Sequence, residues 1–212
     1  ERLLGEEGEQ EASRRIAEAS SAGFCELDLS SLGLRNLPSA LFELQHLTDL
    51  SLTDNHLTSD GIAGLSNLQN LVTLGLSSNR VDKEGIQEIS TLPHLEKLWI
   101  EFNKIGTEGA LLLARMTGLK TLVAPYNLIA EEGALALLGL PTLERLDISG
   151  NAFGNDPEKA RLFLKRLVEA PIAKTLRILN LSGNGQIDYL IPSSVAGSRN
   201  SDEIIDAIRE SL

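Results

Sequence analysis

Apolar residues recur along the chain in a fixed pattern. The frame Leu-x-x-Leu-x-apolar-x-x-Asn begins at Leu47 and returns four more times at a spacing of 24 residues. A further copy, Leu176 to Asn184, follows after 33 residues, and an imperfect first copy starts at Phe24, with Leu32 where the asparagine would stand. Periodicity of this length is typical of repeat proteins, so we expect seven stacked units.

Each frame predicts a short β-strand followed by a helix. The Leu-x-apolar alternation has the period of a strand, and both apolar residues point to one side. One such strand cannot bury its apolar face alone, whereas seven stacked strands form a continuous core. In the second half of the repeat a glycine preceded by an acid also recurs every 24 residues, at Gly61, Gly85, Gly109 and Gly133. We expect helices there, with acids in the first turn and glycines that allow close packing on the neighbouring repeat.

The repeated asparagine is expected to be structural. Its amide both donates and accepts, so it can satisfy backbone groups where the chain leaves the strand. Stacking would align these side chains in a ladder, and removing one would cost about 1–3 kcal/mol. The asparagines of the complete copies are Asn55, Asn79, Asn103, Asn127, Asn151 and Asn184.

Six copies of this frame in register resemble the leucine-rich repeat family, over roughly residues 23–190. The resemblance implies an α/β horseshoe-shaped solenoid of about seven repeats, most of them 24 residues long. Parallel strands would line its concave face, and helices would cover the convex side.

The two ends depart from the repeat. Residues 1–22 are predicted to form an N-terminal cap, with a helix over 9–22 that ends at Gly23. The pattern ends after Asn184, and residues 191–212 contain a last helix from Ser201, which is either a cap for the final repeat or a linker to a further domain.

The sixth repeat is longer and basic. Asp156 and Pro157 predict a helix start, and the helix is expected to run to Glu169. Six of the 19 basic residues fall between 156 and 177. They form either a solvated helix face or a docking surface for an acidic partner or for another domain of the same polypeptide.

The two terminal segments also resemble repeat modules of bacterial multidomain signalling proteins of the Roco type. The resemblance lies in "RRIAEASSAGFCELDLSSLGLRNLP" and "IPSSV…DEIIDAIRESL". It implies a repeat domain that precedes a GTPase or another effector domain. No GxxxxGK[ST] motif occurs in the chain, so we do not expect it to bind GTP itself.

Charge and composition limit the classes of partner that we expect the chain to bind. The 212 residues carry a formal net charge of −11, which disfavours nucleic acid as a partner. No apolar run is long enough to insert into a membrane. With Cys25 as its single cysteine and no secretory leader at Glu1, the chain is expected to be cytoplasmic.

No set of residues indicates catalysis. His46, His56 and His94 fall in different repeats, Cys25 has no partner, and no hydrolase or metalloprotease motif occurs. We therefore expect neither an enzyme nor a cofactor nor a metal site.

The outward-facing positions of the predicted strands indicate where a partner binds. Aligned by repeat, they are mostly small and polar, except in repeats four and five, where large apolar residues gather beside charged ones. Trp99 and Val123 should be direct neighbours, since parallel strands lie about 4.8 Å apart. A central aromatic anchor with a polar surround is typical of a protein-binding hot spot. The predicted partner-binding residues are Lys97, Trp99, Glu101, Phe102, Val123, Pro125, Tyr126 and Arg145.

The sequence thus favours non-catalytic recognition of a protein or peptide through the concave face. The alternative is a regulatory or substrate-recruiting module of a larger signalling enzyme, whose GTPase, ligase or protease domain is absent from this chain and could itself be an intramolecular partner.

Overall fold

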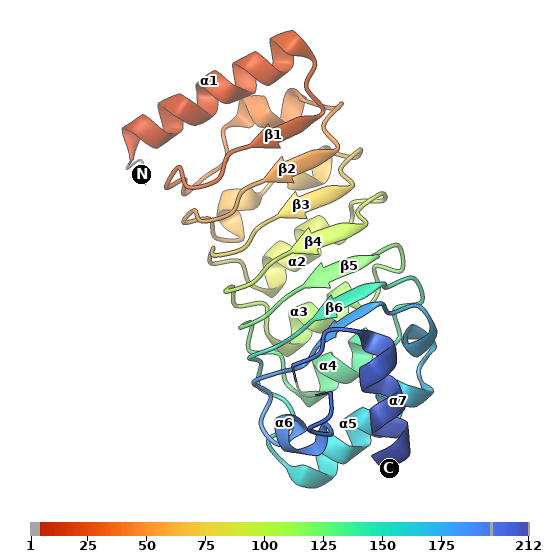
Figure 1. The fold of residues 1–212 in the computed structure, drawn as a ribbon. Coiled ribbons are helices and arrows are strands. Elements are labelled where there is room, and N and C mark those ends of the chain that lie inside the picture. The colour runs from red at the N-terminus through yellow and green to blue at the C-terminus, as the bar shows by residue number, and fades with distance from the viewer. Residues whose placement is uncertain (1–4, 196, 212) are drawn as a thin grey trace.

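The computed structural model describes residues 5–195 and 197–211, which form one elongated solenoid (Figure 1). Residues 1–4 of the predicted N-terminal cap, and Ala196 and Leu212 of the predicted C-terminal segment, lie outside the described residues. The repeats build a single parallel sheet in the order β1-β2-β3-β4-β5-β6-β7, so each strand pairs with the next one in the chain. The strands are β1 (Glu26–Asp28), β2 (Asp49–Ser51), β3 (Thr73–Gly75), β4 (Lys97–Trp99), β5 (Thr121–Val123), β6 (Arg145–Asp147) and β7 (Ile178–Asn180). The predicted α/β solenoid of seven repeats is confirmed.

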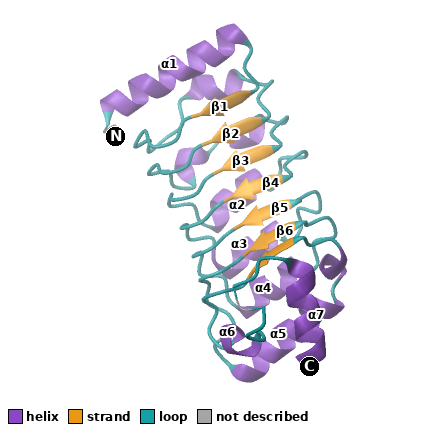
Figure 2. Cartoon of the chain, viewed as in Figure 1, coloured by secondary structure: helices purple, strands orange, loops and turns teal. Residues whose placement is uncertain are grey.

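The middle residue of each strand is a leucine that faces the core. Leu50 pairs in register with Leu74, and Leu98 pairs with Leu122. All seven of these leucines are buried, at 8% exposure or less. The core lies between the sheet and the segments that cover its convex face (Figure 2).

Helices of two kinds return the chain along the convex side. Repeats three to six use α-helices, and the first two repeats use short 3₁₀-helices instead. The α-helices are α2 (Lys83–Ile89), α3 (Gly106–Leu113), α4 (Glu131–Leu137) and α5 (Pro157–Glu169). The 3₁₀-helices are η1 (Ser39–Glu43), η2 (Asp60–Ile62) and η3 (Leu65–Asn67), with η4 (Pro171–Lys174) after α5.

The prediction of one helix in every repeat is therefore wrong in kind for the first two repeats. In the second repeat Gly64 adopts φ 101° between η2 and η3, which interrupts helix growth. In the first repeat the turn starts after Pro38 and spans only Ser39–Glu43. By contrast, Ala and Leu fill α3 and α4, and these residues favour α-helix.

The repeated glycines lie where neighbouring repeats touch, as predicted. A Cβ added at Gly133 would lie 2.9 Å from the Cβ of Ala110 in the preceding helix. A Cβ at Gly61 would lie 2.2 Å from the carbonyl oxygen of Arg35. A side chain at either position would force adjacent repeats apart.

Glu88 on α2 braces the irregular second repeat. Its carboxylate accepts backbone N–H groups of Gly64 at 2.9 Å and Ser66 at 3.0 Å. Partial burial tends to raise the pKa of this carboxyl, but the hydrogen bonds from Ser66 and Gly64 outweigh burial, and the pKa is lowered. The ionised form of Glu88 thus stabilises the two short 3₁₀-helices.

The asparagines form a continuous ladder inside the solenoid. Asn103 donates Nδ2–H to the carbonyls of Leu76 at 2.9 Å and Ile100 at 3.2 Å, and its Oδ1 accepts the N–H of Val81 at 2.8 Å. Asn127 and Asn184 are fully buried, whereas Asn151 is partly exposed. Each amide therefore joins its own repeat to the preceding one.

Both ends of the sheet are covered. At the first, α1 (Glu6–Ala22) buries Ala12, Ile16 and Ala19 and ends at Gly23 in the left-handed conformation. At the last, Leu179 donates its N–H to the carbonyl of Arg199 at 3.1 Å, so residues near 200 add an antiparallel edge to β7.

Two helices complete the C-terminal end, α6 (Ile187–Leu190) and α7 (Ser201–Ser211). On α7, Ile204, Ile205 and Ile208 are buried. Over the described residues this helix packs against α5 and β7. Covered edges prevent strand addition by another chain.

Candidate functional site

The concave face is built from two columns of outward side chains, one from the first and one from the third residue of each strand. The strand register fixes their order along the sheet. The first column is Glu26, Asp49, Thr73, Lys97, Thr121, Arg145 and Ile178. The third-position column is Asp28, Ser51, Gly75, Trp99, Val123, Asp147 and Asn180. Trp99 and Val123 are therefore register partners.

The expectation that Val123 and Pro125 offer apolar surface to a partner is wrong. Val123 is only 3% exposed, and Pro125 is buried. Val123 lies on the concave side between its register partners Trp99 and Asp147, outside the main core cluster. Trp99 itself is partly exposed and does not lie in the core.

Phe102 and Tyr126 form an exposed aromatic stack beside the end of the strands. Their ring centroids are 4.7 Å apart with planes 8° apart, and the residues are 56% and 55% exposed. Both have positive φ, 52° and 53°, which bulky residues rarely adopt. Two large rings are therefore held in solvent at positions where the backbone favours glycine.

The predicted charged residues have separate environments. Lys97 is exposed on β4, whereas Glu101 accepts a hydrogen bond from Ser77 Oγ at 2.6 Å. Arg145 is partly exposed on β6, and its Nε is buried with no hydrogen-bond partner among the described residues. Only Lys97 thus presents its charge fully to solvent.

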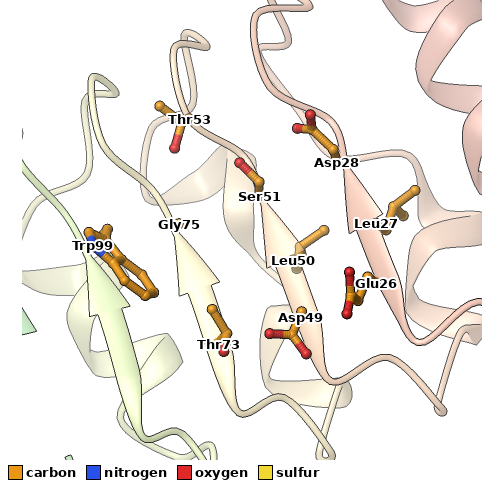
Figure 3. A pocket seen from close by; sticks show the side chains of 10 residues that line it. All are labelled: Glu26, Leu27, Asp28, Asp49, Leu50, Ser51, Thr53, Thr73, Gly75 and Trp99. Atoms are coloured by element: carbon orange, nitrogen blue, oxygen red, sulfur yellow. The ribbon is translucent and has the colours of Figure 1, made fainter. Parts of the chain in front are cut away.

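A groove runs over β1 to β4 on the concave face (Figure 3). It encloses about 590 Å³. The indole of Trp99 extends from β4 toward Gly75 and closes one end, and acidic residues lie at the other end. Its lining residues are Glu26, Leu27, Asp28, Asp49, Leu50, Ser51, Thr53, Thr73, Gly75 and Trp99.

The sequence-based site and the groove share only Trp99. Sequence reasoning centred the site on repeats four and five and missed the groove over repeats one to four. Two signals point to it: Gly75 stands beside Trp99 in the third-position column, and Glu26, Asp28 and Asp49 crowd the first two strands. A missing side chain next to a large one leaves a recess on a sheet face.

Asp147 on the same face serves the fold. One carboxylate oxygen accepts from Ser149 Oγ at 2.7 Å, and the other accepts from Asn180 Nδ2 at 2.9 Å. Among the described residues, no three His, Cys, Asp or Glu side chains gather as metal ligands. In the same part of the chain, no helix has the length and apolar character needed to cross a membrane.

Comparison with solved structures places this architecture among known solenoids. A TDR receptor matches with a TM-score of 0.52 and 21% identity over 82% of this chain and 37% of its own. An internalin, inlF, from Listeria monocytogenes matches with a TM-score of 0.53 and 20% identity over 80% of this chain and 51% of its own. The Arabidopsis receptor kinase HAESA, in complex with the peptide hormone IDA and the co-receptor SERK1, gives a TM-score of 0.53 and 24% identity over 81% of this chain and 29% of its own. At these identities the likeness shows the fold, and this chain spans about half or less of each matched chain.

Sequence comparison identifies the family. No curated protein matches the chain. The leucine-rich repeat model matches residues 43–66, 67–90, 91–114, 139–156 and 173–189, about half of the chain. Together with the seven-stranded parallel solenoid, these matches show that the protein belongs to the leucine-rich repeat family.

Proposed function

We propose that the protein binds a peptide or an extended protein segment through its concave face and does no chemistry on it. The observation that carries the proposal is the groove, a recess of about 590 Å³ beside a partly exposed tryptophan on an otherwise polar sheet face. Tryptophan in a recess is typical of binding hot spots. The aromatic stack of Phe102 and Tyr126 lies in the neighbouring loops and extends the apolar contact area.

The concave face has the shape and chemistry for an extended ligand. Backbone groups of the strands already pair with each other, so affinity has to come from side chains rather than strand addition. Trp99, Phe102 and Tyr126 would supply apolar contact, and Lys97, Glu101 and Arg145 would orient the ligand. The fold can hold a peptide, since the matched HAESA structure contains the peptide hormone IDA. We include a cytoplasmic location in the proposal, because a single cysteine fits a reducing compartment.

The test is selection of a random peptide library on the immobilised protein, followed by affinity measurement on variants. Trp99→Ala is expected to weaken the selected peptides about tenfold or more, since tryptophan hot spots contribute about 2 kcal/mol or more. The matched control is Arg115→Ala, an exposed position outside the concave face, which should bind as the parent does. Selected peptides that bind Trp99→Ala and the parent equally would contradict the proposal.

A second candidate is a regulatory or substrate-recruiting module that contacts an effector domain, as the resemblance to Roco-type proteins implies. The exposed basic residues of the sixth repeat favour it, since six cations fall between residues 156 and 177 of a chain of net charge −11. They are Lys159, Arg161, Lys165, Arg166, Lys174 and Arg177.

The second candidate is tested by hydrogen exchange. If the gene encodes a longer product, a domain docked on this surface should slow exchange in α5 relative to the 212-residue chain. Equal exchange in both, or a reading frame without a further domain, would contradict it.

A further inference from the structure

The groove on the concave face has two ends of different chemistry. Glu26, Asp28 and Asp49 lie on β1 and β2, and the indole of Trp99 lies on β4 (Figure 3). Only Thr73 and Gly75 of β3 separate them, so no charged side chain interrupts the groove between its ends.

The described residues place hydrogen-bond donors, rather than cations, against the carboxylates of Asp28 and Asp49. Asp28 Oδ1 accepts the N–H of Ser30 at 2.9 Å, and Asp49 Oδ2 accepts from Thr48 Oγ1 at 2.7 Å. Arg15 reaches this end of the sheet but donates to the carbonyl oxygen of Asp28 and to the carboxylate of Glu11. Between described residues, no ion pair involves the three groove acids.

The indole end favours an apolar group. Lys97 lies two residues before Trp99 on the same strand and is exposed, so a second cation placed against the indole would meet a like charge. Gly75, the register partner of Trp99, leaves room for a side chain beside the ring.

We propose that the groove selects a basic extended segment, with two Arg or Lys side chains over β1 and β2 and an apolar side chain against Trp99. This inference rests on the proposed function and names its ligand class. Neighbouring strands lie about 4.8 Å apart, so β1 and β4 are about 14 Å apart. An extended chain advances about 3.3 Å per residue, so side chains at i, i+2 and i+4 face the groove and span that distance. The ligand pattern is therefore basic-x-basic-x-apolar.

An acidic ligand fits the groove poorly. Three carboxylates, which form no ion pair with the described residues, repel it at one end, and the whole chain carries a net charge of −11. The charge on the groove thus distinguishes ligands more strongly than its shape does, since Ser51, Thr53, Thr73 and Gly75 of its lining are small.

The probes are three peptides, acetylated and amidated to remove terminal charges: Arg-Ser-Arg-Ser-Leu, Glu-Ser-Glu-Ser-Leu and Arg-Ser-Arg-Ser-Ser. Trp99 is the only tryptophan in the chain, so its fluorescence reports occupancy of the groove directly. The first peptide is expected to change the emission and bind at least about tenfold more tightly than the other two, and added salt should weaken it.

A charge variant makes the test specific. Combining Glu26→Gln, Asp28→Asn and Asp49→Asn removes the charges while keeping the acceptor oxygens used by Ser30 and Thr48. This variant should bind Arg-Ser-Arg-Ser-Leu about tenfold more weakly than the parent, which corresponds to about 0.5 kcal/mol for each charge removed. The matched control, Glu132→Gln with Glu158→Gln and Glu210→Gln, changes net charge equally at exposed positions outside the groove and should bind like the parent.

Two outcomes overturn the inference. One is equal binding of the Arg and Glu peptides, and the other is equal weakening by the groove variant and the control. The library selection separates this failure from that of the proposed function. Selected peptides that need Trp99 but carry no basic residues would contradict only the proposal of a basic ligand. Selected peptides that bind the parent and Trp99→Ala equally well would contradict the proposed binding site on the concave face.

Discussion

The two halves of the sheet share one backbone and differ in what they present. In the acidic half, β1–β3, the concave residues are acidic or small, and short 3₁₀-helices follow β1 and β2, whereas α2 follows β3. In the aromatic half, β4–β6, they include Trp99, Lys97 and Arg145, and α-helices cover the back. The strand register and the inward leucines are the same in both. Inward positions therefore build the solenoid, and outward positions are free to specify a ligand.

The positions at the start of the loop after each strand also vary in side chain from repeat to repeat. Their residues are Ser31, Asp54, Ser78, Phe102, Tyr126, Gly150 and Gly183, and all have positive φ between 52° and 73°. Small polar residues and glycine suit that conformation, whereas Phe and Tyr pay about 1–2 kcal/mol for it. The aromatic half therefore keeps two strained residues that the fold does not need.

The largest expected effect tests whether the two halves share a core. Leu50→Ala and Leu122→Ala remove equivalent inward side chains, which are 2% and 0% exposed. Each should lower the free energy of unfolding by about 3 kcal/mol, from lost burial and the cavity left behind. Urea denaturation followed by circular dichroism measures both. If one substitution lowers the free energy of unfolding by less than half as much as the other, the two parts of the sheet do not share an equivalent core.

Glu88→Gln tests the hydrogen bonds that join α2 of the third repeat to the 3₁₀-helices of the second repeat. At pH 7 the change should cost about 1.5 kcal/mol, because the ionised carboxylate holds the N–H groups of Gly64 and Ser66. The folded-state pKa of Glu88 is lowered, so its contribution is full above the unfolded-state pKa and is lost as pH falls through the folded value.

The measurement for Glu88 is the stability of parent and variant between pH 7 and about pH 3, a range that spans the ordinary glutamate pKa. The difference between them should shrink as pH falls. A constant difference would show that Glu88 acts through shape rather than charge.

Glycine substitutions in the column after the strands measure what the aromatic stack contributes. Ser78→Gly removes only a small side chain at positive φ, whereas Tyr126→Gly removes the ring stacked on Phe102. Tyr126→Gly should be less favourable than Ser78→Gly by about 1 kcal/mol, the value of an aromatic pair. Thermal unfolding checks this, and equal effects of the two changes would show that the stack adds nothing to stability.

Gly75→Val should have the smallest effect on stability and a clear effect on binding. Valine suits a strand, and the nearest atom to a new Cβ is Thr53 Oγ1 at 3.2 Å, a side-chain end that can move. We expect the free energy of unfolding to change by about 0.5 kcal/mol or less.

The new side chain would also fill the recess beside Trp99, so Arg-Ser-Arg-Ser-Leu should bind about tenfold more weakly. A fluorescence titration of the folded variant measures this. Unchanged affinity would place the ligand elsewhere on the sheet.

Much of the fold follows from sequence periodicity. The 24-residue frame predicts every strand, the parallel order and the stacked asparagines, because inward leucines and buried amides leave few alternatives. The helix over Pro157–Glu169 is found with the predicted bounds. The repeated Gly61 does not predict the helix type in the second repeat, because the interruption comes from Gly64, which has positive φ and lies so close to Phe42 that no Cβ fits there.

The site was harder to predict than the fold. The columns correctly bring Trp99 beside Val123, but they do not reveal that Val123 and Pro125 are buried. Burial on a sheet face depends on the rotamers of both adjacent strands, which a column of letters does not contain. The recess at Gly75 likewise arises from where the Trp99 ring lies.

The sequence by itself determined the family, the seven-stranded solenoid and the asparagine ladder, because each depends on a spacing that every repeat restates. Tertiary structure alone decided where the concave face is open. The indole of Trp99 extends toward Gly75, which has no side chain, whereas Val123 on the opposite neighbouring strand is buried. Which side of Trp99 is open depends on contacts between repeats that are 24 residues apart in the sequence.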